Sequence, residues 1–551
     1  MSAPAATLSE PPAAPSRTST ISTLVPTPAP MDPVEKLTSR LPEDRAKEAA
    51  PEGVIWVEWE SPSDPANPLN WSKRRKWTIS SVGIAFCALV SLSVSAYSIS
   101  ENYVREDLHT TRILAILGIT MFTITFGAAP LLLAPLSEVY GRNNIYLISA
   151  VVFALFFLPQ ALAQNIQTIL VSRFISGIAG STAVSLVGGT LADVFRGEER
   201  GTPMALFSFA AFGSTGLGPV VFGYLAQTKG FRAVNWVLFA CSAAFAIAVY
   251  FVLDETRASV LLSRKAAKLR KETGDDRYMS KDDFERGSLK EMMKTSLGRP
   301  VQMLLHEPVL LAITAWISFT WGVLYLFLVA IPLVYGRLWG FNTGECGLIY
   351  ITQTIGSALG FAYDQYCMRY YHANVARRGP EARLYSAFGG GLCVPIGAFI
   401  FCFTSYGHLH WIGSAIGITI LYIGMLLVYL CSFSYLADAY VIYASSALSS
   451  MSFIRNICGA VFPLFTTQMY DRLGVQGAAG LTAGLATLLA ATPFVLFVYG
   501  ARLRARSPFA KELARLEAEE REKQGRRDSP NEISESAAVG VGAEEKKAEE
   551  V

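Results

Sequence analysis

Two residues of opposite charge lie four positions apart in the short segment "PLSEVYGRNN", residues 135 to 144, which separates two long apolar runs. They are Glu138 and Arg142. A solvated pair of this kind contributes less than about 1 kcal/mol. A charge contact that exists in only one arrangement of two moving parts shifts a conformational equilibrium instead. We favour the second interpretation and predict a latch at this position.

Two further cations lie several residues inside apolar segments, Arg173 and Arg455. A cation near the centre of a bilayer costs about 3 kcal/mol or more unless it faces water or a partner. Arg173 is near enough to a segment end to snorkel to the interface, whereas Arg455, with Asn456 beside it, lies deeper. We expect both guanidinium groups to face a central cavity. No acid lies comparably deep, and the nearest ones, at segment ends, are Glu101, Asp193, Glu345, Asp364 and Asp438.

Aromatic and amide side chains accompany these arginines along the apolar segments. The candidates for lining the cavity are Tyr97, Trp316, Trp321, Tyr325, Gln353 and Asn456. Each aromatic residue could instead serve in packing. A positive, aromatic cavity suits a neutral or anionic amphiphile better than a cation, because guanidinium groups bind carboxylates and rings bury apolar area.

Glycines and a proline are concentrated in one apolar segment, at Gly213, Gly218, Pro219 and Gly223. Small residues let helix backbones approach closely within a membrane, and proline introduces a local kink. We expect this segment to make a dense contact, and we expect Gly218→Val to abolish function while the protein stays in the membrane.

The elements that must position these residues are membrane helices. The chain has 551 residues, is 52% hydrophobic and 17% charged, and its composition is typical of a polytopic membrane protein. Segments of about 20 apolar residues, long enough to cross a bilayer, are expected at 77–98, 112–135, 145–163, 168–190, 203–226, 233–253, 308–335, 346–366, 384–404, 411–436, 444–468 and 478–500. Twelve spans place both termini on one side. Only about six of the 47 Lys and Arg residues fall on the opposite side, which predicts cytosolic termini.

The predicted organisation follows from these spans. A Pro, Ala, Ser and Thr-rich tail at 1–70 is expected to be disordered and cytosolic. A first six-helix bundle covers 71–253, a cytosolic central loop covers 254–305, and a second six-helix bundle covers 306–503. A charged cytosolic tail follows at 504–551.

Several function classes are disfavoured. No GxxxxGK[ST] segment occurs, so we expect no ATP site and no cofactor, and energy must come from an ion gradient. The five His residues show no HxxxH or HExxH spacing and the eight Cys no CxxC pair, so we expect neither a metal site nor an enzyme. The net charge of +3 is dispersed, which argues against nucleic acid as a partner.

The motifs resemble those of a known family, the major facilitator superfamily, and within it the fungal twelve-span drug:proton antiporters that include cycloheximide-resistance and polyamine transporters. "APLSEVYGRN" keeps Leu136, Gly141 and Arg142 of the family's loop motif, with Glu138 in place of Asp. "RFISGIAG" matches R-x-x-x-G-x-x-G, beginning at Arg173. "STGLGPVVFG" resembles the antiporter motif through Gly218, Pro219 and Gly223.

The resemblance implies an all-α fold of two pseudo-symmetric six-helix bundles, with Glu138, Gly141 and Arg142 at an inner gate. It implies proton-coupled efflux of an amphipathic organic molecule, such as a secondary metabolite or a xenobiotic, by alternating access. Polyamine export, or import of a small organic acid or sugar, is the alternative. The candidates for proton coupling are Asp438 and Glu101. We expect a monomer in the plasma membrane, with the vacuolar membrane as the alternative location.

Overall fold

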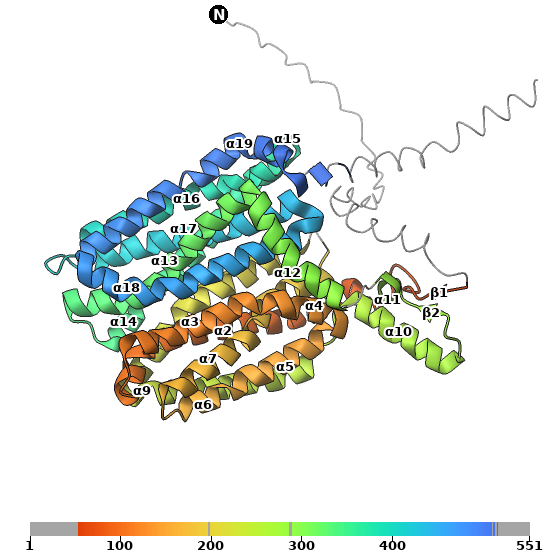
Figure 1. The fold of residues 1–551 in the computed structure, drawn as a ribbon, viewed down its shortest axis with the longest axis horizontal. Helices are drawn as coiled ribbons and strands as arrows, with labels where there is room; N and C mark the ends of the chain where they lie inside the picture. Colours follow the sequence, from red (N-terminus) through yellow and green to blue (C-terminus); the bar gives the residue numbers. More distant parts are fainter. Residues whose placement is uncertain (1–52, 197–198, 286–288, 510, 513–514, 516–551) are drawn as a thin grey trace, which may run out of the picture.

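The computed structural model describes residues 53–196, 199–285, 289–509, 511–512 and 515. Two groups of long helices lie side by side, and a smaller helical segment joins them at one end of the molecule (Figure 1). In Figure 1 the first group, drawn in red to yellow, is below the second, drawn in green to blue.

The first group, which we call the N-half, runs from α2 to α9. Its elements are α2 (Lys73–Asp107), α3 (Arg112–Ala128), α4 (Pro130–Tyr140), α5 (Arg142–Leu155), α6 (Phe157–Ala161), α7 (Ile166–Gly180), α8 (Thr182–Val194) and α9 (Gly201–Val252). The second group, the C-half, comprises α13 (Pro308–Trp339), α14 (Thr343–Ile349), α15 (Ile351–Arg378), η3 (Gly379–Arg383), α16 (Leu384–Thr404), α17 (Ile412–Tyr440), η4 (Val441–Tyr443), α18 (Ala444–Leu489) and α19 (Thr492–Arg506).

Seven helical stretches are long and apolar enough to cross a membrane, or eight if the pair α3 and α4, bent by 45°, counts as one span. Two of these stretches contain a reversal, because Gly230 in α9 and Gly474 in α18 adopt non-helical backbone angles at a φ of 72°. Asp107, near the end of α2, pairs with Arg232 just after the break in α9, while Phe245 stacks back on Phe86. The chain therefore turns back at Gly230.

Counting each arm separately gives six membrane-length rods in each half of the described chain. In the N-half they are α2, α3 with α4, α5 with α6, α7 with α8, and the two arms of α9. In the C-half they are α13, α14 with α15, α16, α17, and the two arms of α18, the second of which continues into α19. The predicted six-plus-six arrangement is present.

The segment between the halves is more ordered than the predicted loop. It contains α10 (Ala258–Thr273), β2 (Tyr278–Met279), α11 (Lys281–Glu285) and α12 (Leu289–His306). We call the end of the molecule that carries these elements the linker face and the opposite end the far face. Arg75, in the first turn of α2, pairs with Asp254 at 2.6 Å, and Ser507, which follows α19, forms a hydrogen bond with Glu307. The N-terminal end of α2 and the C-terminal end of α19 therefore both lie at the linker face.

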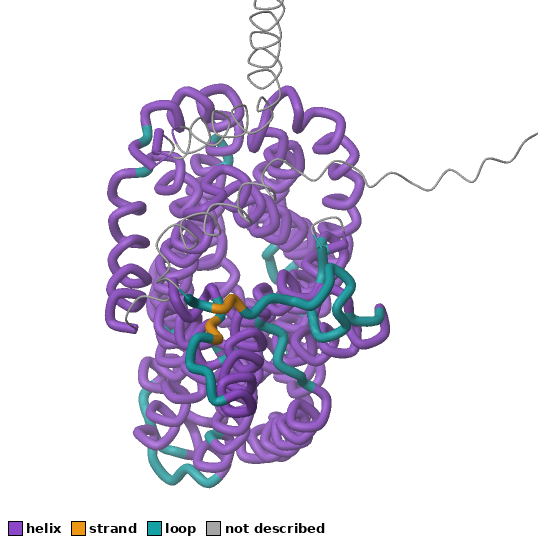
Figure 2. Tube along the Cα trace, turned by 90° about the vertical axis from the view of Figure 1, so that its right-hand side faces the viewer, coloured by secondary structure: helices purple, strands orange, loops and turns teal. Residues whose placement is uncertain are grey.

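The prediction that residues 1–70 form a disordered tail is wrong for their last part, whereas residues 1–52 lie outside the described chain. Strand β1 (Ile55–Trp56) pairs in parallel with β2, and η1 (Pro68–Asn70) leads into α2. Lys265 of α10 contacts Glu60 at 2.9 Å. Figure 2, viewed from the linker face, shows the two short strands lying in front of the helix ends. Strands β1 and β2 are about 220 positions apart along the chain, so local composition could not reveal that they pair.

Candidate functional site

Arg455 lies in a cage of aromatic rings inside the C-half. Its guanidinium carbon is 4.1 Å from the ring centroid of Trp321 on α13, and 5.3 Å and 5.5 Å from those of Tyr429 and Phe433 on α17. The residue is 2% exposed. A cation over aromatic faces is stabilised by the ring quadrupoles. The Nε and one terminal nitrogen nevertheless lack a hydrogen-bond partner in the described part of the chain, which leaves donors for a further group.

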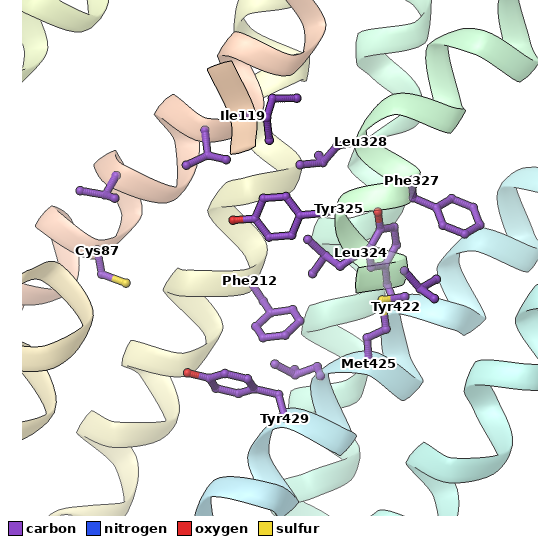
Figure 3. Packing of buried hydrophobic residues seen from close by; sticks show 14 of the residues in the cluster. Cys87, Ile119, Phe212, Leu324, Tyr325, Phe327, Leu328, Tyr422, Met425 and Tyr429 are labelled. Atoms are coloured by element: carbon purple, nitrogen blue, oxygen red, sulfur yellow. The ribbon is translucent and has the colours of Figure 1, made fainter. Parts of the chain in front are cut away.

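The N-half closes this cage from the other side. Phe212 of α9 packs edge-on against Trp321 at 5.3 Å and against Tyr429 at 4.9 Å. Figure 3 shows Tyr325 and Tyr429 extending from the C-half toward the helix that carries Phe212. The cluster is thus built from both halves. Any rigid-body movement of one half against the other must change it.

Arg173 occupies a corresponding place in the N-half. Its guanidinium carbon is 4.3 Å from the ring of Tyr97 and 4.7 Å from the ring of Phe122, and its Nε donates to the Gly118 carbonyl at 3.3 Å. The residue is 1% exposed. It does not snorkel. Tyr325, on α13 of the C-half, lies 6.1 Å from the Trp321 ring of the arginine cage, measured between ring centroids.

The remaining predicted cavity residues divide into two groups. Gln353 and Asn456 lie at the interface between the halves: Gln353 donates to the Phe212 carbonyl at 3.2 Å, and Asn456 packs against Gly127. Both carry a buried side-chain oxygen without a partner. Trp316 is different, because its ring packs near Gly391 of α16, within the C-half. This contact favours packing for Trp316, and its place in a cavity stays a prediction.

Buried carboxylates are found near helix ends and in loops of the described chain, away from the two central arginines. They are Asp64, Glu101, Glu255, Glu307 and Glu381. The centre therefore carries two positive charges with no acid buried beside them.

The predicted gate residue Arg142 belongs to a compact charge network at the linker face. Its Nε lies 2.6 Å from Asp193 at the end of α8, and its side chain is 8% exposed. Glu255 accepts hydrogen bonds from the backbone N–H groups of Arg142 and Arg257 at 3.1 and 3.0 Å. Gly141, with φ 95°, is required here, because a Cβ would collide with the Glu255 carboxylate. The sequence motif identified Arg142 but not these acidic partners.

The C-half carries a similar network at the same face. Arg383, which precedes α16 as Arg142 begins α5, pairs with Asp438 at 2.7 Å. The hydroxyl of Tyr371 also donates to Asp438, at 3.2 Å. Asp438 ends α17 much as Asp193 ends α8. These two partners give Asp438, predicted as a proton-coupling residue, a structural function.

Glu138 is exposed and forms no ion pair with the part of the chain that the structure describes. The contact predicted for a latch is therefore not formed among the described residues in this conformation, and the latch stays a prediction. The nearest element that bridges the halves at the linker face is α12, which packs against both α4 and α18. Ser296 of α12 donates to the Leu131 carbonyl at 3.0 Å, and Arg299 lies 5.5 Å from the Tyr443 ring.

The glycine-rich segment of α9 contacts both halves. Gly218 faces α2, where a Cβ would meet the Leu92 carbonyl at 2.6 Å. Gly216 faces α15, where a Cβ would lie 2.8 Å from the Tyr350 carbonyl. Gly223 faces α14, where a Cβ would lie 3.2 Å from the Thr343 carbonyl. A Cβ on Gly213 would instead lie 3.4 Å from the ring of Phe209, on the same helix. Pro219 contributes its carbonyl to the contact with α14.

The partner segment on α14 was not identified from the sequence. A Cβ on Gly347 would collide with the Pro219 carbonyl, and one on Gly344 would collide with the Tyr224 ring. The signal that could have found them is a pair of small residues three positions apart, in "TGECG". Nearby, the Gly344 N–H donates to Gln227 at 2.9 Å and the hydroxyls of Tyr103 and Thr343 are 3.0 Å apart. The halves are therefore joined firmly toward the far face.

Glu101 lies near the far face, where it lines a cavity of about 280 Å³ between α2, α3 and α13. It is 5% exposed, and its Oε1 has no hydrogen-bond partner among the described residues. In the described part of the chain no group of three or more His, Cys, Asp or Glu side chains is arranged to hold a metal ion.

Two helical halves that meet around a central site are typical of a secondary transporter. The family model of the Major Facilitator Superfamily matches residues 82–463. The MFS-type transporter paaT of Penicillium rubens is 38% identical over 81% of this chain and 82% of its own. The multidrug transporter mdrA of Aspergillus fumigatus is 35% identical over 84% of this chain and 76% of its own. The chain belongs to the Major Facilitator Superfamily.

The fold agrees with solved members of this family. The proton:xylose symporter XylE superposes with a TM-score of 0.56 at 15% identity, over 78% of this chain and 96% of that one. The predicted family and fold are confirmed. The family is one of transporters and not of enzymes, and the chain is a multi-pass membrane protein.

Proposed function

We propose that this protein exports an amphipathic organic molecule with a neutral or anionic polar group, in exchange for protons, by alternating access. The observation that carries this proposal is the pair of buried arginines, Arg173 in the N-half and Arg455 in the C-half, each of which lies against aromatic rings. The multidrug name of the relative mdrA supports export of organic molecules as the class of activity.

The substrate chemistry follows from unused hydrogen-bond donors. Arg455 has two buried nitrogens without partners, and Arg173 has one. A carboxylate or another polar acceptor would satisfy them, and the surrounding rings would cover an apolar skeleton. A polyamine would place ammonium groups beside these cations, so polyamine export is the weaker alternative.

The linker face corresponds to the cytosol in this proposal. Helix α10 is strongly basic, with Arg264, Lys265, Lys268, Arg270 and Lys271 on 16 residues. Basic segments next to membrane spans are retained on the cytosolic side. The plasma membrane is the proposed location. The structure then corresponds to a conformation joined on the extracellular side, in which substrate enters from the cytosol.

Glu101 is the better of the two proposed coupling residues. Asp438 is held by Arg383 and Tyr371, so protonating it would break an ion pair and a hydrogen bond. Glu101 has an unpartnered oxygen at a cavity on the side from which protons would enter. Glu101→Gln should uncouple transport from the proton gradient, while Asp438→Asn should reduce stability.

Transport into reconstituted vesicles tests the proposal. The purified protein is placed in liposomes with an imposed pH gradient, and uptake of a radiolabelled aromatic carboxylate is compared with uptake of radiolabelled spermidine. Carboxylate movement against the proton flux, reduced at least tenfold in Arg455→Gln, is the expected result. Movement with the proton flux would indicate an importer, and preferential spermidine transport would indicate the polyamine alternative. No catalytic activity and no partner beyond lipid, substrate and protons is required, and a monomer suffices.

A further inference from the structure

The far-face cavity contains two polar groups of opposite charge that the structure leaves unsatisfied. The Oε1 of Glu101 and the Nε of Arg112 are both buried and lack a hydrogen-bond partner within the described chain. The two side chains form no ion pair with each other within the described structure, although both line the cavity. A buried polar atom without a partner costs about 1–3 kcal/mol unless something fills the site.

The other two arginines that line the cavity each have an acidic partner. Arg337, on α13, pairs with Asp471 at 2.6 Å, and its side chain is 44% exposed. Arg105, on α2, lies 3.5 Å from Glu106 at the exposed rim. Arg112 is therefore the cation of this cavity that remains available for a ligand, and Glu101 is the available acceptor.

Apolar side chains form part of the remaining walls. They come from both halves, with Ile99 and Ile119 on one side and Val329 and Leu333 on the other. A cavity of about 280 Å³ that combines apolar side chains with converging polar groups can hold a small molecule. It is separate from the arginine cluster at the centre, with which it shares none of its lining residues.

We infer that this cavity is a binding site for a small hydroxy carboxylic acid, with the carboxylate on Arg112 and the hydroxyl donating to Glu101. A simple inorganic anion would satisfy Arg112 but leave the Glu101 oxygen without a donor. A cation would meet three arginines. A molecule with a carboxylate, a hydroxyl and an apolar body satisfies both groups and the walls.

This inference rests on the proposed function for its biological meaning, since the cavity would then be the last binding site that an exported acid occupies before its release. Because its walls belong to both halves, separation of the halves at the far face would dismantle the site and free the ligand. The binding site itself does not depend on the direction of transport.

The test is calorimetric binding to the purified full-length protein. The probe is 4-hydroxyphenylacetate, compared with phenylacetate, which lacks the hydroxyl, and tyramine, which replaces the carboxylate with an ammonium group. We expect 4-hydroxyphenylacetate to bind about tenfold or more tightly than phenylacetate, and tyramine not to bind. Equal affinity for the two acids would overturn the assignment to Glu101.

Variants locate the probe. Arg112→Gln should weaken binding of 4-hydroxyphenylacetate by about tenfold or more, and Arg112→Lys should recover part of the loss. The control is Arg232→Gln, a far-face arginine whose side chain is 44% exposed and lies outside the cavity. It should change affinity by less than about twofold. Binding that depends on Arg455 and not on Arg112 would place the probe at the centre and overturn the inference.

Cysteine protection provides a measurement on a protein that retains Arg112. In Asn102→Cys the thiol lines the cavity, and 4-hydroxyphenylacetate should slow its reaction with a membrane-impermeant maleimide at least fivefold, relative to the background of the native cysteines. An unchanged rate would contradict the inference. Failure of the proposed function looks different, because the wild-type vesicles would then show no proton-driven transport of organic acids whether or not the cavity binds the probe.

Discussion

Gly216→Ala should release the contact that joins the two halves toward the far face. A Cβ on Gly216 would lie 2.8 Å from the Tyr350 carbonyl and 2.7 Å from the Thr354 hydroxyl, whereas ordinary contact begins at 3.4 Å. Helices α9 and α15 must therefore separate by about 0.6 Å, or the side chains must rearrange. Inserting a methyl group into a packed interface costs about 1–3 kcal/mol.

This cost applies only to the conformation in which α9 and α15 touch. The equilibrium should therefore move toward the alternative conformation by a factor of about 5 to about 150, since 1.4 kcal/mol is tenfold. Gly347→Ala should act in the same direction, because its Cβ would collide with the Pro219 carbonyl from the other side of the interface.

Labelling from the far side measures this shift. Thr120 is 3% exposed and its hydroxyl donates to the Ala460 carbonyl across the halves at 2.8 Å. In a Thr120→Cys background, an impermeant maleimide added to the far side should react 5-fold to 150-fold faster when Gly216→Ala is present. Gly213→Ala, on the same helix with its nearest contact at 3.4 Å, is the matched control and should change the rate by less than about twofold. A Gly216→Ala protein that is folded but labels at the control rate would refute the reasoning.

Four further predictions follow from the gate, the charge network, the glycine segment and the centre. Glu138→Gln should shift the conformational equilibrium toward the present conformation by up to about fivefold, because the substitution weakens a contact that exists only in the alternative conformation. Far-side labelling measures this shift, and an unchanged equilibrium would exclude a latch. Asp193→Asn leaves a buried guanidinium without its counter-ion and should lower the unfolding free energy by about 3–5 kcal/mol, measured by thermal denaturation in detergent. Gly218→Val should abolish transport in vesicles without loss of membrane-inserted protein, because its side chain would collide with α2, and full activity would contradict this. Trp321→Ala removes one wall of the arginine cage and should weaken substrate binding about tenfold while transport remains proton-dependent.

Much of the fold could be predicted from the sequence, because apolar length is a local property. A helix in a membrane satisfies its own backbone hydrogen bonds, so each run of about 20 apolar residues indicates a span without knowledge of its neighbours. The span expected at 346–366 was found although α15 is too polar in its second half to pass as a membrane helix on composition alone. The long break expected near 254–305 did separate the two halves, but the helices within it were missed because their packing partners lie elsewhere.

Of the candidate site, the sequence predicted only the residues whose burial in a membrane costs the most free energy. Arg173 and Arg455 were identified because a cation inside an apolar run requires an explanation. Their surroundings were not, since Phe212, Tyr429 and Phe433 look like any other aromatic residues of a membrane helix. Trp316 and Trp321 illustrate the difficulty, because they lie five positions apart on one helix and face different neighbours.

The sequence by itself determined the class of protein, the number of spans, the two buried cations and the motif glycines, because hydrophobic length, desolvation cost and backbone freedom depend on each residue and its near neighbours. Only the tertiary structure decided which half each glycine faces, that Asp193 and Glu255 complete the network of Arg142, and that Glu101 and Arg112 share a cavity. These are contacts between residues far apart in the chain, and they form only when twelve helices of similar composition pack in one particular arrangement.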